Sequence, residues 1–108
     1  MDLELPEAAA AALDVADLVP AGRVTTYGAL GAVLGIGPRQ AGRIMSEYGH
    51  LTSWWRVVRA DGTLAPPLAA RAAEHWAAEG TPLHTGTRAD QTQRRVDMAR
   101  ALWIPSEG

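Results

Sequence analysis

The residues that could do chemistry in this chain gather near its middle, at Ser53, Trp54, Trp55 and Arg56. Two adjacent indoles offer a large, polarisable apolar surface, and the guanidinium beside them offers several hydrogen-bond donors. Such a set could bind a planar ring, or it could simply pack two aromatic side chains into a core. A neutral indole has no usable lone pair for attack and does not titrate near pH 7, so neither tryptophan could act as a nucleophile or as a base.

The composition excludes several other kinds of chemistry. The chain has 108 residues and no cysteine, which removes disulfides, thiolate metal sites and cysteine nucleophiles together. The histidines, His50, His75 and His84, have no ligand spacing, so we expect neither a metal nor another cofactor. No apolar run approaches the roughly 18 residues of a membrane span, and no signal peptide opens the chain. We therefore expect a cytoplasmic protein without a membrane partner.

Charge is distributed unevenly along the chain. Residues 1–17 carry a net charge of −5, residues 18–60 carry +4 and residues 61–108 carry −1, which together give the formal net charge of −2. The acidic total argues against a nucleic-acid binder, but the basic middle is compatible with docking on phosphates through one face.

The elements that position the tryptophans follow from helix signals. Apolar stripes at helical spacing predict helices at 6–18, 27–34, 38–48 and 66–79. Thr26 is a suitable N-cap for the second of these, and Pro38 and Pro66 suit the first positions of the third and fourth. Residues 24–25 and 57–58 read as short extended pieces, the latter buried.

The second and third helices are joined by Gly35-Ile36-Gly37, a pattern typical of a helix-turn-helix. An Asp61-Gly62 turn predicts a small hairpin or wing across residues 55–65. Residues 81–93 read as a loop, and residues 94–103 read either as a helix or as a short strand with Asp97 capping a last turn. The expected fold is mainly α with a small β wing, a winged helix-turn-helix-like single domain.

Five groups of residues then fall in a familiar order. They are Pro20-Ala21-Gly22-Arg23-Val24-Thr25-Thr26-Tyr27-Gly28, Pro38-Arg39-Gln40-Ala41-Gly42, Trp54-Trp55-Arg56-Val57-Val58, Asp61-Gly62 and Glu79-Gly80. The series resembles the DNA-binding domain of the O6-alkylguanine-DNA alkyltransferases. It is most similar to their non-enzymatic relatives, the alkyltransferase-like proteins, which carry tryptophan in place of the acceptor cysteine. The resemblance covers about residues 5–82 of a single domain spanning 1–108, and residues 83–108 form a C-terminal extension.

The resemblance implies a protein that cannot do the transferase reaction. The transferase motif is Pro-Cys-His-Arg-Val, in which a histidine generates the thiolate and a glutamate orients that histidine. Here Trp54 stands at the nucleophile and Trp55 at the general base, while Glu79 aligns with the glutamate. We therefore expect that the chain is not an enzyme.

The resemblance also assigns DNA-binding roles. A reader of O6-alkylguanine must flip the nucleotide out of the duplex, here through the minor groove. Tyr27 would push on the phosphate 3′ of the target, or else it packs the first helix against the second. Arg39 would enter the stack as the intercalating finger. Arg43 is the alternative, because this chain has two residues fewer before Arg39 than many relatives have. Gln40 and Gly42 complete the expected DNA-binding set.

The lesion pocket is expected to contain Trp54, whose apolar surface suits an alkyl group. Arg56 could donate into this pocket or make a buried structural pair. Alkyltransferase-like proteins commonly keep a histidine at position 55, so Trp55 is expected in the core rather than in the pocket.

Three functions remain for comparison. The first is a monomeric sensor that binds O6-alkylguanine in duplex DNA and signals to the damage-recognition proteins of nucleotide excision repair. The alternative is a winged-helix transcriptional regulator that reads sequence with Arg39, Gln40 and Arg43 and has no lesion preference. The third is an interaction module without DNA affinity, which the acidic first helix would suit.

Overall fold

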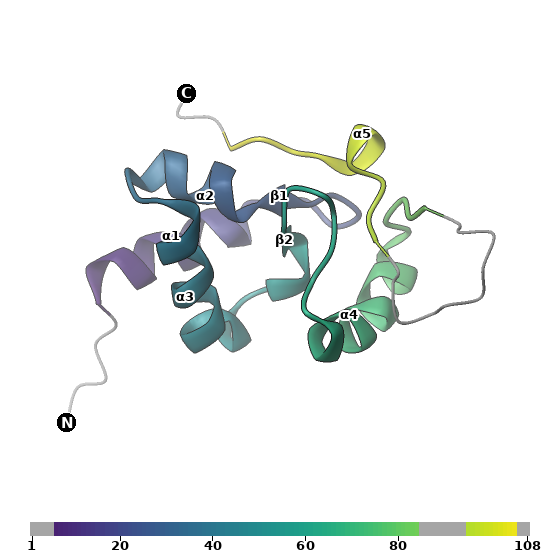
Figure 1. The fold of residues 1–108 in the computed structure, drawn as a ribbon, viewed down its shortest axis with the longest axis horizontal. Coiled ribbons are helices and arrows are strands. Elements are labelled where there is room, and N and C mark those ends of the chain that lie inside the picture. The colour runs from purple at the N-terminus through teal and green to yellow at the C-terminus, as the bar shows by residue number, and fades with distance from the viewer. Residues whose placement is uncertain (1–5, 85–94, 106–108) are drawn as a thin grey trace.

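The four helices expected from the sequence are all present, each within one residue of its expected ends. The computed structural model, which describes residues 6–84 and 95–105, has α1 (Glu7–Asp17), α2 (Tyr27–Leu34), α3 (Pro38–Tyr48), α4 (Pro66–Glu79) and the short α5 (Met98–Ala101). Two 3-10 helices, η1 (Gly49–Leu51) and η2 (Trp54–Arg56), lead into the strand β2 (Val57–Val58), which lies beside β1 (Thr25–Thr26). Helices α1, α2 and α3 lie on one side of the strands and α4 on the other (Figure 1). The mainly α fold with a small β part is confirmed.

The β part is not the predicted hairpin. β2 pairs in parallel with β1, with Thr25 opposite Val57 and Thr26 opposite Val58, so the hairpin across residues 55–65 is wrong. The Asp61-Gly62 turn does form, with Gly62 N–H donating to the carbonyl of Arg59 at 2.8 Å. Beyond it the chain enters α4 through two prolines instead of returning as a strand. Both residues of β2 are fully buried, as is usual for parallel strands covered on both faces.

The turn between α2 and α3 requires a glycine in the middle of α2. A Cβ added at Gly31 would lie 2.5 Å from the carbonyl oxygen of Ile36, which is closer than two such atoms can approach. The start of α2 is fixed as expected, because the Thr26 hydroxyl accepts a hydrogen bond from Ala29 N–H at 2.9 Å. The absence of a side chain at Gly31 therefore sets how closely the two helices of the helix-turn-helix are joined.

We expect Gly31→Ala to lower the free energy of unfolding by about 2 kcal/mol, although alanine favours helix more than glycine. The reason is the backbone overlap with Ile36, which only a shift of the turn can relieve. Urea unfolding followed by circular dichroism measures the change. Gly42→Ala in α3 is the matched control, since a Cβ there would meet no atom within 4 Å. The control should gain about 0.5 to 1 kcal/mol from helix propensity. Equal stability of the two variants would contradict this view of the turn.

Two apolar clusters meet at β2. Val57 packs with α1, α2 and α3, in a cluster whose other members are Ala12, Ala16, Leu30, Ala41 and Met45. Val58 packs with α4 and the C-terminal segment, in a cluster with Val24, Leu64, Ala69, Ala72, Trp76, Val96 and Ala101. Successive strand residues point to opposite faces, so this two-residue strand joins both halves of the core. Tyr27 and Trp54 pack against both clusters and therefore lie at their junction.

The segment 95–105 returns to the body of the protein along β1. Trp103 N–H donates to the carbonyl of Val24 at 2.7 Å, and Val24 N–H donates to that of Ala101 at 3.0 Å. The Arg23 guanidinium reinforces the contact by donating to the carbonyls of Ala101 and Leu102. Of the two alternatives for residues 94–103, the strand followed by a last turn is the closer one. Val96 makes an antiparallel bridge with Leu83, and Asp97 stands at the N-cap position of the single turn α5. Arg94 and residues 85–93 of the expected loop lie outside the described residues.

Within the described ranges, no helix is both long and apolar enough to span a bilayer.

Candidate nucleic-acid interface

The tryptophan segment is held on α4 by backbone as well as side-chain contacts. Trp54, Trp55 and Arg56 form the single turn η2 between Ser53 and β2. The indole N–H of Trp76, which is fully buried in α4, donates to the carbonyl of Trp55 at 2.9 Å. This bond satisfies a carbonyl that a one-turn helix leaves free, and it fixes η2 to the core.

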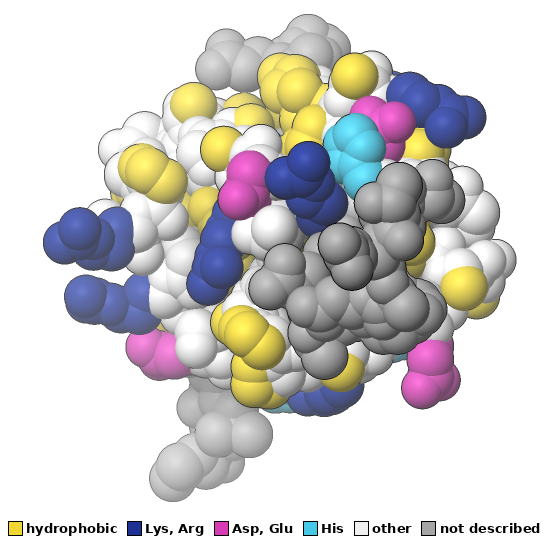
Figure 2. Space-filling view, turned by 45° about the vertical axis from the view of Figure 1, so that its right-hand side comes forward, with side chains coloured by type: hydrophobic (Ala, Val, Ile, Leu, Met, Phe, Trp, Pro, Cys, Tyr) yellow, Lys and Arg dark blue, Asp and Glu magenta, His cyan; other side chains and the backbone are white. Residues whose placement is uncertain are grey.

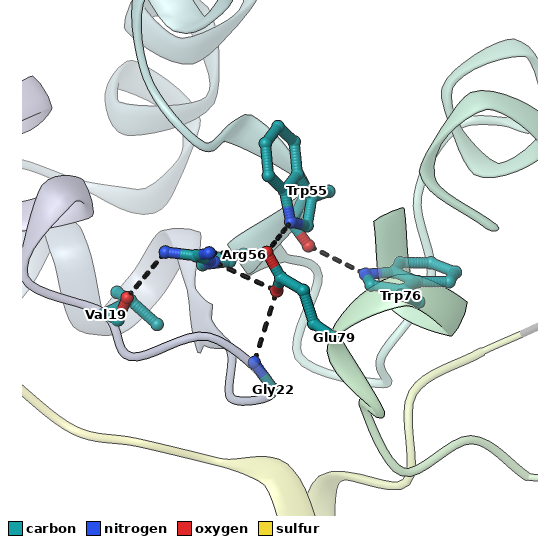
Figure 3. A network of polar contacts seen from close by, with 6 residues as sticks. All are labelled: Val19, Gly22, Trp55, Arg56, Trp76 and Glu79. Atoms are coloured by element: carbon teal, nitrogen blue, oxygen red, sulfur yellow. Dashed lines mark hydrogen bonds and ion pairs between the residues drawn. The ribbon is translucent and has the colours of Figure 1, made fainter. Parts of the chain in front are cut away.

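Glu79, near the end of α4, collects hydrogen bonds from three residues (Figure 3). Its carboxylate accepts from the indole N–H of Trp55 at 3.0 Å, from Arg56 Nε at 3.1 Å and from Gly22 N–H at 3.2 Å. Desolvation by burial acts to raise the pKa of the Glu79 carboxyl. The hydrogen bonds from Arg56, Gly22 and Trp55 and the charge of Arg56 outweigh it, so the pKa of Glu79 lies below its ordinary value. The carboxylate therefore joins α4, η2 and the loop before β1.

Arg56 makes the structural pair, one of the two arrangements considered from the sequence. Its Nη2 forms an ion pair with Glu79, and its Nη1 donates to the carbonyl of Val19 at 3.0 Å. Together with Nε, every nitrogen of the guanidinium has a protein partner. The donors of Arg56 thus point at Glu79 and Val19, and the side chain positions η2.

Trp54 lies beside a stack of two rings. The ring of Trp55 stacks on His75, with centroids 3.6 Å apart and planes at 8°. Trp54 is 5.7 Å from Trp55 and 5.8 Å from His75, nearly perpendicular to both. Because these two distances are almost equal, Trp54 must stand at the side of the stack, where both rings present their edges to it. The orientation of the half-buried Trp54 indole is therefore fixed by its neighbours.

Three residues of α4 face the tryptophan segment at a spacing of four. Arg71 lies over Trp54, with its guanidinium carbon 5.3 Å from the ring centroid, while His75 stacks on Trp55 and Glu79 bonds Trp55. Sequence reasoning missed Arg71 and His75 as part of the site. Their i, i+4, i+8 spacing with Glu79 in the helix predicted at 66–79 was the signal that could have found them.

The expected DNA-binding residues of α3 share an exposed side of that helix. Arg39, Gln40 and Arg43 line a surface groove of about 550 Å³ between α3 and the beginning of α1. Gly42 lies on the same helix, and a Cβ there would meet open space, so packing does not require a glycine at this position. The structure therefore brings the two candidate finger arginines together at one groove, away from Glu79.

Tyr27 begins α2 at the junction of the two apolar clusters. Burial raises the pKa of its phenol, and the charge of Arg59 opposes the rise. The contacts with both clusters agree with the expected packing role, and the role on a phosphate stays a prediction.

Basic side chains are spread over the surface drawn in Figure 2, singly or in twos with carboxylates between them, and they form no single patch there. Within residues 6–84 and 95–105, no three His, Asp or Glu side chains come together as metal ligands would.

Comparisons with known proteins identify a family model and solved structures of similar fold. Residues 7–81 match the family described as the DNA-binding domain of 6-O-methylguanine DNA methyltransferase. Two solved structures, S. pombe Atl1 in complex with damaged DNA containing O6-carboxymethylguanine and S. pombe ATL in complex with DNA, superpose on this fold with a TM-score of 0.76. Each is 22% identical in sequence, and each match covers 95% of this chain and 100% of that chain. No curated protein sequence matches the chain.

Proposed function

The chain belongs to the family of the 6-O-methylguanine DNA methyltransferase DNA-binding domain, and on this basis we propose that it recognises O6-alkylguanine in duplex DNA without removing the alkyl group. The fold that it shares with S. pombe Atl1 supports a DNA-lesion partner. The chemistry at positions 54 and 55 supports binding without transfer.

The contact between Trp55 and Glu79 is the observation that carries the proposal. In the transferases a histidine at this position generates the thiolate, and a glutamate orients the histidine. Here the indole N–H of Trp55 donates to Glu79 at 3.0 Å, and Trp54 stands where the thiol would be. The indole satisfies the glutamate as the imidazole would, yet it can neither accept a proton nor activate a nucleophile. What the site retains is a rigid aromatic surface, which suits recognition.

The proposed mode of binding is nucleotide flipping through the minor groove. Arg39 would fill the space that the flipped base leaves, Tyr27 would press on the neighbouring phosphate, and Gly42 would let the DNA backbone approach α3 closely. Trp54 would form a wall of the pocket that receives the base. Arg56 has its guanidinium engaged with Glu79, so its proposed part is to hold Trp54 in place.

The proposal extends to the fate of the complex. A protein that marks a lesion and cannot remove it needs a repair system, and nucleotide excision repair is the system that the family resemblance suggests. We propose a monomer in the cytoplasm that presents the marked site to damage-recognition proteins of that pathway.

The test is a fluorescence titration with matched duplexes that contain guanine or O6-methylguanine, at two salt concentrations. We expect lesion-selective quenching of the tryptophans and no methyl group on the protein by mass spectrometry. Flipping an already weakly paired base costs less, which favours the damaged site. Equal affinity for both duplexes would overturn the proposal. Tight binding to one undamaged sequence would then indicate a transcriptional regulator. Absence of DNA binding at both salt concentrations would indicate an interaction module.

The two arginines of α3 should differ in their effect on affinity. Arg39→Ala is expected to weaken lesion binding about 30-fold, because an intercalated guanidinium loses both stacking and hydrogen bonds. Arg43→Ala, on the same groove, should weaken it about threefold and lower the salt dependence, as the loss of one phosphate contact does. Fluorescence anisotropy of a labelled duplex measures both. The opposite order would make Arg43 the finger.

A further inference from the structure

The parallel pairing of β1 and β2 brings together two residues that are far apart in the sequence. Thr26 lies opposite Val58, so the residues that follow them, Tyr27 and Arg59, leave the two strands at the same end. Burial raises the pKa of the Tyr27 phenol, and the charge of Arg59 acts against that rise, as a guanidinium near the ring would. The strand register and this electrostatic effect both place Arg59 beside Tyr27.

The turn after β2 holds the backbone of Arg59 in place. The Arg59 N–H donates to the carbonyl of Thr63 at 2.9 Å, and the Arg59 carbonyl accepts from Gly62 N–H at 2.8 Å. The carbonyl of Gly62 in turn accepts from Val96 N–H at 2.9 Å, which ties the turn to the C-terminal segment. The base of the Arg59 side chain is therefore fixed relative to β1 and Tyr27.

The guanidinium of Arg59 has donors to offer a ligand. The side chain is exposed, and within the part of the chain that the structure describes it makes neither a hydrogen bond nor an ion pair. The carboxylate of the same turn, Asp61, accepts from the N–H and the hydroxyl of Thr63 at 3.1 and 2.6 Å. These hydrogen bonds are the main cause of the lowered pKa of Asp61, and the charge of Arg59 is the smallest. Arg59 is therefore a charged donor next to the neutral donor of the Tyr27 phenol.

We propose that Arg59 and Tyr27 together bind one phosphate of the DNA backbone, the phosphate 3′ of the flipped nucleotide. The inference rests on the proposed function, which already directs Tyr27 to that phosphate and gives Arg59 no part. The guanidinium would supply the charge and a fork of N–H donors, and the phenol would supply a neutral donor and a rigid ring. Flipping turns a nucleotide about its backbone, so a phosphate that Arg59 holds in place gives the Tyr27 ring a fixed group to press on.

The experiment asks whether Arg59 and that phosphate act as one contact. Dissociation constants are measured by anisotropy for O6-methylguanine duplexes with a normal backbone, with an uncharged methylphosphonate directly 3′ of the lesion, or with one at a distant position of the same strand. A guanine duplex with a normal backbone gives the lesion preference. The proteins are the wild type, Arg59→Gln and, as the matched control, Arg100→Gln, which removes the charge of an exposed arginine of α5.

On the normal backbone, we expect Arg59→Gln to bind about fivefold more weakly than the wild type and to show a shallower salt dependence, as the loss of one phosphate contact does. The guanine duplex should weaken equally, because a phosphate contact carries no base information, so the lesion preference is kept. On the duplex with the 3′ methylphosphonate, the same substitution should weaken binding less than about twofold, because the charge that Arg59 meets is already gone. With the distant methylphosphonate the loss should again be about fivefold. Arg100→Gln should bind every duplex as the wild type does.

Equal losses for Arg59→Gln on all three backbones, or no loss on any, would overturn the inference and leave the proposed function standing. A larger loss on the O6-methylguanine duplex than on the guanine duplex would place Arg59 at the lesion instead of at the backbone, and would overturn it as well. Equal affinity of the wild-type protein for guanine and O6-methylguanine would instead overturn the proposed function, and the inference with it.

Discussion

Replacing Trp54 by alanine is expected to abolish the preference for O6-methylguanine over guanine while the protein stays folded. Stacking of a base or its substituent on an indole is worth about 1 to 3 kcal/mol, which corresponds to roughly a ten- to hundredfold preference. Without the indole, the flipped base meets the edges of Trp55 and His75 and gains no flat surface. The ratio of dissociation constants for the two duplexes should fall to within about twofold of one.

The loss of stability in Trp54→Ala should be smaller than for a core tryptophan. Trp54 is half-buried and touches both apolar clusters, so its removal should cost about 2 kcal/mol, less than the 3 to 5 kcal/mol typical of a fully buried ring. A domain of this size tolerates such a loss. Thermal unfolding and far-UV circular dichroism check that the variant is native before binding is measured.

Two further variants separate pocket loss from general damage. Trp54→Phe keeps a flat ring and should retain most of the lesion preference. Trp103→Ala removes a partly buried tryptophan whose backbone N–H donates to the carbonyl of Val24, next to β1, and it should leave the preference unchanged. Binding is followed by anisotropy of a labelled duplex, so the loss of a fluorescent residue does not affect the readout. Full lesion preference in Trp54→Ala would exclude this residue as the pocket wall.

Much of the framework could be predicted because its signals are local. The ends of α2, α3 and α4 follow from Thr26, Pro38, Pro66 and Gly80, each of which acts on its own turn of helix. The pairing of β2 could not be predicted in this way. Its partner, β1, lies about thirty residues earlier, and an Asp61-Gly62 turn next to a strand is the usual signal of a hairpin. Burial of both faces of β2 decided the outcome, and burial is a property of the whole fold.

Some residues of the tryptophan segment and α4 could be singled out from the sequence, but their contacts could not. Trp54, Trp55 and Glu79 are found from their order in the sequence, but the sequence does not show what Glu79 binds. With no histidine at position 55, the glutamate has no obvious partner, and a tryptophan there suggests core packing. The structure shows that Trp55 does pack against the core, and that its indole N–H also donates to Glu79 while His75 stacks on the same ring. A side chain that is apolar on its faces and a donor at its edge can do both.

The second large effect is expected at Glu79, where Glu79→Leu should lower the free energy of unfolding by about 3 kcal/mol at pH 7. The substitution leaves the guanidinium of Arg56 and the N–H of Trp55 without their acceptor in a poorly hydrated site, and unpaired groups of this kind are costly. The Arg56 and Glu79 side chains are only 17% and 14% exposed, so water can replace the lost partner only in part. Glu79→Gln retains one acceptor and should lose about half as much.

A double-mutant cycle tests whether the cost comes from the stranded charge. In Arg56→Met/Glu79→Leu both partners are replaced by apolar side chains, so the double variant should be more stable than Glu79→Leu alone by about 1 kcal/mol or more. At this chain length the difference corresponds to several degrees in Tm. Equal stability of the single and double variants would mean that Arg56 finds another partner when Glu79 is lost.

The pKa of Glu79 fixes how its contribution depends on pH. The pKa of its carboxyl is lower in the folded protein than the ordinary value of 4.5, so the unfolded chain takes up the proton first as the pH falls. The stability from the ionised carboxylate is therefore complete above about pH 4.5 and is lost as the pH falls through the folded-state pKa. Glu79→Gln should flatten this part of the curve of unfolding free energy against pH. Asp61 also has a lowered pKa, through its hydrogen bonds from Thr63, so Asp61→Asn is the control. Because Asp61 is exposed, the control should flatten the curve much less.

Glu79→Leu should also reduce the preference for the lesion, because η2 carries Trp54 and Glu79 holds η2 in place. Glu79 needs no contact of its own with DNA for this effect. A variant that lost stability but kept the full preference would show that the His75 stack alone positions Trp54.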